Sequence, residues 1–172
     1  QRHHDVQRAV LTDLAEEGVS LALGLEQMES PQQPELDRYN RGEIDLDQLV
    51  EATRWPERWD NYLQYRPIVE AARKSQVPVL ALNARSETIR QVFRSGGIDK
   101  LATEARQELP AEIQLDDPPY LRLLNVRMMV HASATADTLR PMFEAQIARD
   151  ESMAAALCAF LQSNEGQGRT AI

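Results

Sequence analysis

The sequence has little of several residue types, and each shortage excludes a class of protein. Its 172 residues include one cysteine, Cys158, which excludes an internal disulfide and says nothing of the redox compartment. The net charge is −8, whereas a nucleic-acid-binding protein needs a basic surface. No apolar run approaches the ~20 residues of a membrane-spanning helix. A nucleophile elbow, a phosphate-binding loop, a CxxC pair and an HExxH motif are all missing, so no local motif names an enzyme class.

The two ends of the sequence lack the features of natural chain ends. Polar residues from Gln1 feed directly into a helical pattern, and residues 170–172 have the composition of the start of a strand. Neither a signal peptide nor a lipidated N-terminal cysteine is present in the residues shown. We therefore expect further residues on both sides, and targeting signals could be among them.

Two short apolar runs, Val19–Glu26 and Val77–Asn83, predict the strands of the fold. Continuous apolarity over this length is typical of parallel strands covered on both faces. Helical patterns alternate with these runs, which predicts an α/β fold: a mostly parallel sheet flanked by helices on both faces, with an added helical segment. The length suits one domain over residues 1–172, and we expect its terminal strands to be missing, since only two strands are visible.

Helices are predicted from hydrophobic periodicity and from the residues that cap them. The first runs from His3 to Glu17 and stops at Gly18. Asp45 and Ser86 are expected to cap two later helices. Further helices are expected at 35–41, 65–74, 86–94, 116–131 and 137–162. In the helix at 65–74, we expect Ile68, Val69 and Ala72 to face the core.

Polar residues gather where the strands are expected to end. Glu26 closes the first visible strand and Asn83 the second, while His3 and His4 begin a helix that would follow an earlier strand. In open α/β sheets the site lies at this edge. Glu26 could be a general base, a metal ligand or a structural ion-pair partner. The histidines could bind a metal, transfer protons or bind an anion, although an exposed pair without function is the commoner case.

The stretch from Ala52 to Pro67 is rich in aromatic and basic residues. Its Tyr62 and Tyr65 could ligate iron as phenolates, stack on a flat ligand or fill the core, which is the usual role of aromatics at helical spacing. Trp55 and Trp59 are expected to be structural. The basic residues could meet carboxylates of a ligand, although solvated ion pairs are their default. They are Arg54, Arg58 and Arg66.

Two later helices carry weaker candidates. Tyr120, Met128 and His131 share one face of the helix at 116–131, and all three are possible iron ligands, but such a stripe is more often core. Gln146 and Asp150 interrupt the apolar face of the last helix, where they could tie down a loop or line a pocket.

Three segments of the chain together resemble a known family. The runs GLEQMESPQQPELDRYNRGEIDLDQL, TRWPERWDNYLQYRPIVEAARKSQVPVLALNAR and FEAQIARDESMAAAL are similar to the ChaN-like haem-binding proteins, an iron-regulated family of bacterial lipoproteins. The HHDVQ start matches the region that follows the family's first strand. The family's opening glycine–glutamate strand and its closing glycine–histidine strand end are absent here, so ligands in those strands cannot be assigned.

The resemblance implies haem as cofactor, iron acquisition or storage as function, and a tyrosine as iron ligand. Tyr65 in the YRP motif is the first choice for that ligand and Tyr62 the second. His3, His4 and Glu26 would line or support the same edge. A homodimer that holds two stacked haems, a lipoprotein anchor in a segment not shown and a location on the periplasmic side of the cell envelope are further implications.

A phenolate also makes chemical sense as the ligand. It is a hard anionic donor that favours ferric haem, and Arg54, Arg58 or Arg66 could meet the propionates. Two readings compete. One is a metal-dependent hydrolase, by a more distant resemblance to erythromycin-esterase-like folds, with Glu26 as base or ligand helped by His3 or His4. The other is a partner-binding module with no ligand.

Overall fold

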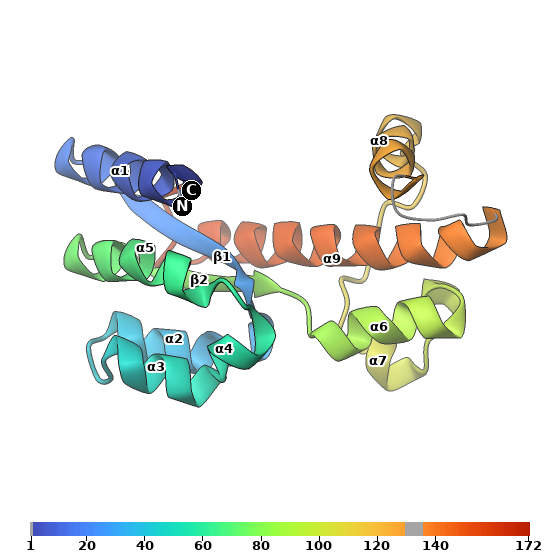
Figure 1. Cartoon of the computed structure of the whole chain (residues 1–172), viewed down its shortest axis with the longest axis horizontal. Helices are drawn as coiled ribbons and strands as arrows, with labels where there is room; N and C mark the ends of the chain where they lie inside the picture. The colour runs from blue at the N-terminus through green and yellow to red at the C-terminus, as the bar shows by residue number, and fades with distance from the viewer. Residues whose placement is uncertain (1, 130–135) are drawn as a thin grey trace. The chain divides into compact units, whose positions relative to one another are not determined.

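The structure is a computed structural model that describes residues 2–129 and 136–172 (Figure 1). The chain forms two compact units. The first comprises Gln1–Asn83 and Ala156–Ile172, and the second comprises Ala84–Ala155. The expectation of one domain over the whole chain stays a prediction.

The first unit is built on a parallel sheet of three strands, in the order β2-β1-β3, within the described residues. The strands are β1 (Leu21–Glu29), β2 (Val79–Asn83) and β3 (Thr170–Ala171). β1 pairs with β2 in the register Leu23 to Val79 and with β3 in the register Leu21 to Thr170. The α/β prediction is confirmed, and the third strand begins at Thr170 as its composition indicated.

The predicted end of the first strand at Glu26 is wrong, because β1 continues to Glu29. A bulge lies between Leu25 and Glu29, where β1 advances further than β2 before pairing Glu29 with Asn83. The sequence did not indicate this continuation, because the polar residues Glu26 and Gln27 interrupt the apolar run. Glu29 is consequently the carboxylate at the end of the strand, and it is buried.

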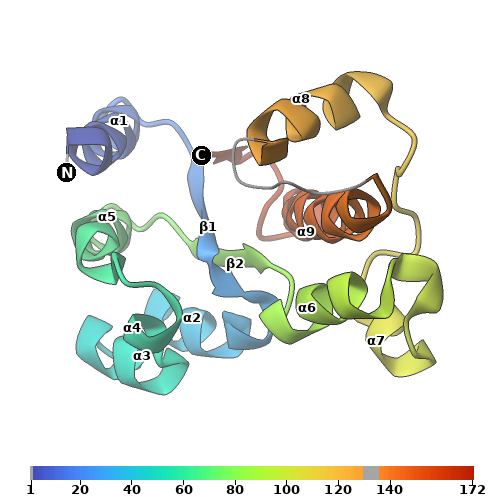
Figure 2. The same ribbon diagram turned by 45° about the vertical axis from the view of Figure 1, so that its right-hand side comes forward.

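Helices α1 (Arg2–Glu16) and α5 (Tyr62–Lys74) pack side by side against the sheet (Figures 1 and 2). α1 ends before Gly18, which has the positive φ of +80° that such a stop requires. As predicted, Ile68, Val69 and Ala72 of α5 are buried. They join the leucines of β1 in the core of this unit, which also holds Leu11 of α1. α5 begins at Tyr62, three residues earlier than predicted.

Three shorter helices continue the first unit. They are α2 (Gln33–Asn40), preceded by a 3₁₀ turn at Ser30–Gln32, α3 (Leu46–Thr53) and α4 (Trp55–Arg58). Asp45 caps α3 as predicted. Its side chain accepts a hydrogen bond from the Gln48 backbone amide, and the Gln48 side chain accepts one from the Asp45 backbone amide. Arg54 takes the left-handed conformation between α3 and α4, so the chain turns there before Pro56.

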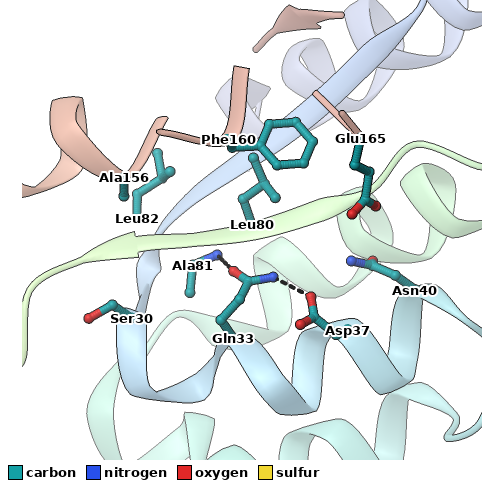
Figure 3. Close-up of a pocket in the computed structure, with 10 residues that line it drawn as sticks. All are labelled: Ser30, Gln33, Asp37, Asn40, Leu80, Ala81, Leu82, Ala156, Phe160 and Glu165. Carbon is teal, nitrogen blue, oxygen red and sulfur yellow. Dashed lines mark hydrogen bonds between the residues drawn. The ribbon is translucent and has the colours of Figure 1, made fainter. Parts of the chain in front are cut away.

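Side-chain amides of α2 cover the outer edge of β2 (Figure 3). The Asn40 side chain accepts from the Val79 amide and donates to the Val79 carbonyl, both at 3.0 Å. Gln33 accepts from the Ala81 amide at 2.7 Å. Leu80 and Leu82 point to the opposite face of the sheet from Ala81, where Phe160 faces them (Figure 3). The sheet therefore has helical cover on both faces, as predicted.

The second unit is helical over its described residues. It contains α6 (Ser86–Ser95), a 3₁₀ turn at Ile98–Lys100, α7 (Thr103–Gln107), α8 (Pro118–Met129) and most of α9 (Ala136–Gln162). Ser86 is the first residue of α6 and not its cap, which corrects the expectation; Arg85 holds the cap position. Buried Glu144 of α9 accepts the Ile98 amide at 2.8 Å and pairs with Arg140 at 2.7 Å.

Candidate functional site

An apolar pocket of about 380 Å³ opens between α1, β1 and α5. It lies toward the carboxyl end of β1, the edge at which sites of open α/β sheets form. Its wall is aliphatic except for one phenol, Tyr65, and three polar residues, of which Glu26 carries a charge. The lining residues are Val6, Gln7, Val10, Leu23, Gly24, Leu25, Glu26, Gln27, Tyr65, Ile68 and Ile172.

The structure brings two of the sequence candidates into direct contact. The rings of His4 and Tyr65 meet edge to face, with centroids 4.5 Å apart and planes at 80°. Both residues are half-buried. His4 Nδ1 is shielded from solvent and has no hydrogen-bond partner among the described residues. His3, the neighbour of His4, is exposed.

Glu26 and Asn83 meet as the strand-end argument expected, but through a backbone group. The Asn83 side chain donates to the Glu26 carbonyl at 2.9 Å. The Glu26 residue is exposed and its side chain borders the pocket, whereas Asn83 is buried. Asn83 is accordingly a structural residue that ties β2 to the bulge of β1.

Tyr39 and Tyr62, the other tyrosines of the first unit, do not line this pocket. Tyr39 is buried, donates to the Val69 carbonyl at 3.3 Å and carries Arg73 over its ring at 4.7 Å. Burial raises the pKa of Tyr39, and Arg73 only partly opposes this, so Tyr39 resists becoming a phenolate. Tyr62 packs against Trp55 and the core, with ring centroids 6.3 Å apart.

Each of the three candidate arginines is paired with a carboxylate. Arg58 contacts Glu29 at 2.6 Å, and the Glu29 side chain is only 11% exposed. Arg66 contacts Asp47 at 2.6 Å, but the Asp47 side chain is 80% exposed. Hydrogen bonding to Asp47 raises the pKa of Arg66 further above its usual value. Arg54 pairs with Glu57 on the surface.

Glu29 was not identified from the sequence, although it holds the carboxyl end of β1 in place. Its side chain pairs with Arg58, and its backbone amide donates to Gln32 at 2.8 Å. Gln32 in turn donates to the Thr53 carbonyl at 2.7 Å. The signal that could have revealed Glu29 is buried Met28, an apolar residue that returns after Glu26 and Gln27.

The remaining candidates fall in the second unit. The Tyr120 hydroxyl donates to Asp150, which also accepts from Gln146 at 2.9 Å. Asp150 thus links α9 to the helix α8 and not to a loop, and with Tyr120 it also lines a small pocket. His131 lies outside the described residues, and so does the side chain of Met128.

The described residues lack both a membrane-spanning helix and a cluster of metal-binding side chains. None of their helices combines the length and apolarity needed to cross a membrane. They also contain no cluster of three or more histidine, cysteine or acidic side chains arranged to hold a metal ion.

Comparison with known proteins identifies the family to which this chain belongs. No curated protein is significantly similar in sequence. A solved structure of ChaN of Campylobacter jejuni, which describes cofacial haem binding, matches with a TM-score of 0.62 and 18% identity. The match covers 90% of this chain and 60% of that one, and at this identity it establishes the fold alone. The profile of the family described as haem-binding uptake, Tiki superfamily, ChaN matches residues 1–172. The chain therefore belongs to the ChaN family of haem-binding uptake proteins, as the resemblance of its motifs indicated.

Proposed function

We propose that this chain binds haem for bacterial iron acquisition or storage, without turnover, and that Tyr65 is the iron ligand. One observation carries the proposal: Tyr65 is the single phenol in the wall of a largely apolar pocket at the carboxyl edge of a parallel sheet. Membership of a haem-binding family supports the ligand class. It does not favour the alternative of a metal-dependent hydrolase that uses Glu26, His3 and His4.

The pocket has the chemistry that a ferric porphyrin needs. Val10, Leu23 and Ile68 offer apolar surface to a flat ring, which gains free energy as that surface leaves water. A phenolate oxygen supplies an anionic donor to ferric iron. No hydrogen bond from the described residues holds the Tyr65 hydroxyl elsewhere, so iron would compete with no existing partner.

Arg66 is the best of the three arginines for a propionate. Its partner Asp47 is mostly in water, so replacing that carboxylate with a propionate costs little. Arg58 is a poorer choice, because leaving Glu29 would strand a largely buried carboxylate without its counter-ion. Arg54 is paired with Glu57 on the surface and its side chain is 69% exposed; none of the three arginines is among the residues that line the pocket.

A homodimer and an envelope location also belong to the proposal. Val6 and Val10 line the pocket and remain 61% and 46% exposed, so a second copy could cover apolar surface there. The lipoprotein anchor would lie in a segment outside this sequence, on the periplasmic side. Both features derive from the family resemblance.

Haemin titration with matched tyrosine variants tests the assignment. Tyr65→Phe keeps the ring and its contact with His4 but removes the oxygen. We expect a shifted Soret band and haem affinity at least about tenfold lower, a loss of ~1.4 kcal/mol or more. Tyr62→Phe is the control, because Tyr62 lies on the same helix yet packs against Trp55. Equal spectra and affinities for wild type and Tyr65→Phe would remove Tyr65 from the ligand role.

A further inference from the structure

We propose that His4 is a positioning residue for Tyr65: its imidazole hydrogen-bonds the phenol oxygen and so tunes the oxygen as a ligand. The inference rests on the proposed function and adds a role for a second side chain. It originates in the ring contact between His4 and Tyr65 and in the unsatisfied nitrogen beside that contact.

The buried His4 Nδ1 lacks a hydrogen-bond partner among the described residues. A buried polar atom without a partner costs roughly 1–3 kcal/mol, so such atoms in folded proteins usually have one. The Tyr65 hydroxyl, on the residue whose ring His4 touches, is not among the buried atoms that lack a partner, but no described residue hydrogen-bonds it. Each atom therefore supplies what the other lacks.

The rings of His4 and Tyr65 are in direct contact. Ring centroids 4.5 Å apart leave the two side chains in van der Waals contact, and planes at 80° direct the edge of one ring at the face of the other. The proposed hydrogen bond would form by rotation of the imidazole about its terminal torsion, which has a broad and shallow energy profile.

The helices and the pocket around His4 and Tyr65 hold the two side chains close together. α1 and α5, which carry the two residues, pack along each other, so their separation is fixed by the core. Tyr65 borders an apolar pocket, where a hydrogen bond to its oxygen meets little competition from water. His3, the preceding residue, is exposed and lacks this environment.

The consequence for ligation follows from electrostatics. An imidazole N–H that donates to a phenolate oxygen withdraws negative charge from it, so the oxygen donates less to ferric iron. Removing that bond strengthens the donation and favours the ferric state. His4→Phe should therefore shift the reduction potential of the bound haem to more negative values. It should also move the phenolate-to-iron charge-transfer band to longer wavelength.

A haem-free measurement tests the hydrogen bond by itself. Nitrogen chemical shifts of the His4 imidazole, from long-range proton–nitrogen correlation spectra, are compared between wild type and Tyr65→Phe. Because the variant keeps the aromatic ring, a difference reports the hydroxyl. We expect the His4 Nδ1 shift to change and the His3 shifts to stay the same. Identical His4 shifts in the two proteins would overturn the inference.

The haem-loaded proteins test the tuning. His4→Phe preserves a ring against Tyr65 without polar atoms, His4→Gln restores an N–H donor, and His3→Phe is the matched neighbour. We expect the potential and the charge-transfer band to shift in His4→Phe, to return toward wild type in His4→Gln, and to remain unchanged in His3→Phe. If His4→Phe keeps the wild-type reduction potential and charge-transfer band, the role of His4 is overturned, while the role of Tyr65 as ligand is not. Failure of the wild type to take up haemin would overturn the proposed function, whatever the imidazole shifts show.

Discussion

Asn40 pairs with Val79 as a neighbouring strand would. Its side chain accepts from the Val79 amide and donates to the Val79 carbonyl, both at 3.0 Å, from a position 39 residues away in the chain. β2 is an edge strand of the described sheet, and an uncovered edge exposes backbone groups that can pair with other chains. α2 thus closes this edge with side-chain amides instead of a further strand.

Replacing Asn40 should therefore destabilise the fold. Asn40→Ala leaves the amide and the carbonyl of Val79 without their partners, and each unsatisfied group costs roughly 1–3 kcal/mol. We expect the free energy of unfolding in urea to fall by at least ~1 kcal/mol, with more aggregation during refolding. Arg38→Ala on the same helix removes only exposed ion pairs, so its loss should stay below ~1 kcal/mol. Equal stabilities for the two variants would contradict the role of Asn40.

The ion pair between Glu29 and Arg58 should contribute more to stability than the surface pair between Arg54 and Glu57. The Glu29 side chain is 11% exposed and Arg58 39%, so removing Arg58 leaves a largely buried carboxylate that water reaches only in part. We expect Arg58→Met to lower the free energy of unfolding by roughly 1–3 kcal/mol, less than the value for a fully buried pair.

Two controls belong to this measurement. Arg54→Met breaks a surface pair with Glu57 and should have an effect near zero. The double variant Glu29→Gln with Arg58→Met removes the stranded charge and should recover part of the loss. A double variant no more stable than Arg58→Met would show that the charge of Glu29 is not the cause.

Alkaline pH should destabilise the protein through Tyr39. Burial raises the pKa of Tyr39, so the unfolded state releases this proton at lower pH than the folded state. The stability contributed is complete below the ordinary phenol pKa of about 10 and is lost as pH rises through the folded pKa, by up to ~1.4 kcal/mol per pH unit. The free energy of unfolding, measured in urea at several pH values above 9, should decline more steeply for wild type than for Tyr39→Phe. Parallel curves would argue against a raised pKa.

Local features of the fold could be predicted from the sequence, because neighbouring residues determine them. Asp45 and Gln48 lie three positions apart, so their reciprocal cap needs no tertiary information. The burial of Ile68, Val69 and Ala72 follows from helical spacing in the same way. The apolar runs identified the two main strands, since a buried strand is apolar whatever lies against it.

Contacts between distant residues could not be predicted in this way. The end of β1 at Glu29 depends on Arg58 and on pairing with Asn83, both far along the chain. His4 and Tyr65 were separate candidates, and nothing in the local sequence indicates that their rings meet. The choice of Tyr65 over Tyr62 came from family resemblance; the pocket now supports it with a physical reason, because Tyr65 borders the cavity and Tyr62 packs on Trp55.

A larger residue at Gly24 should force the Leu82 side chain to move and so lower stability. A Cβ on Gly24 would lie 2.6 Å from Leu82 Cδ1 and 3.2 Å from Leu82 Cγ, across two paired strands. Gly24→Val is therefore expected to overpack this face and to cost roughly 1–3 kcal/mol in free energy of unfolding. Leu82→Ala alone should also destabilise, since it removes apolar contacts beside Phe160.

The double variant separates this clash from a general intolerance of β1 to substitution. If Leu82 is the obstacle, Gly24→Val combined with Leu82→Ala should be more stable than the sum of the two single effects, because the valine occupies the space that the leucine leaves. The free energy from urea unfolding of all four proteins gives the coupling directly. Strict additivity would mean that Gly24 is required for its backbone and not for the approach of Leu82. Haem uptake by the double variant provides a second readout, because Gly24 lines the proposed pocket while Leu82 lies outside it.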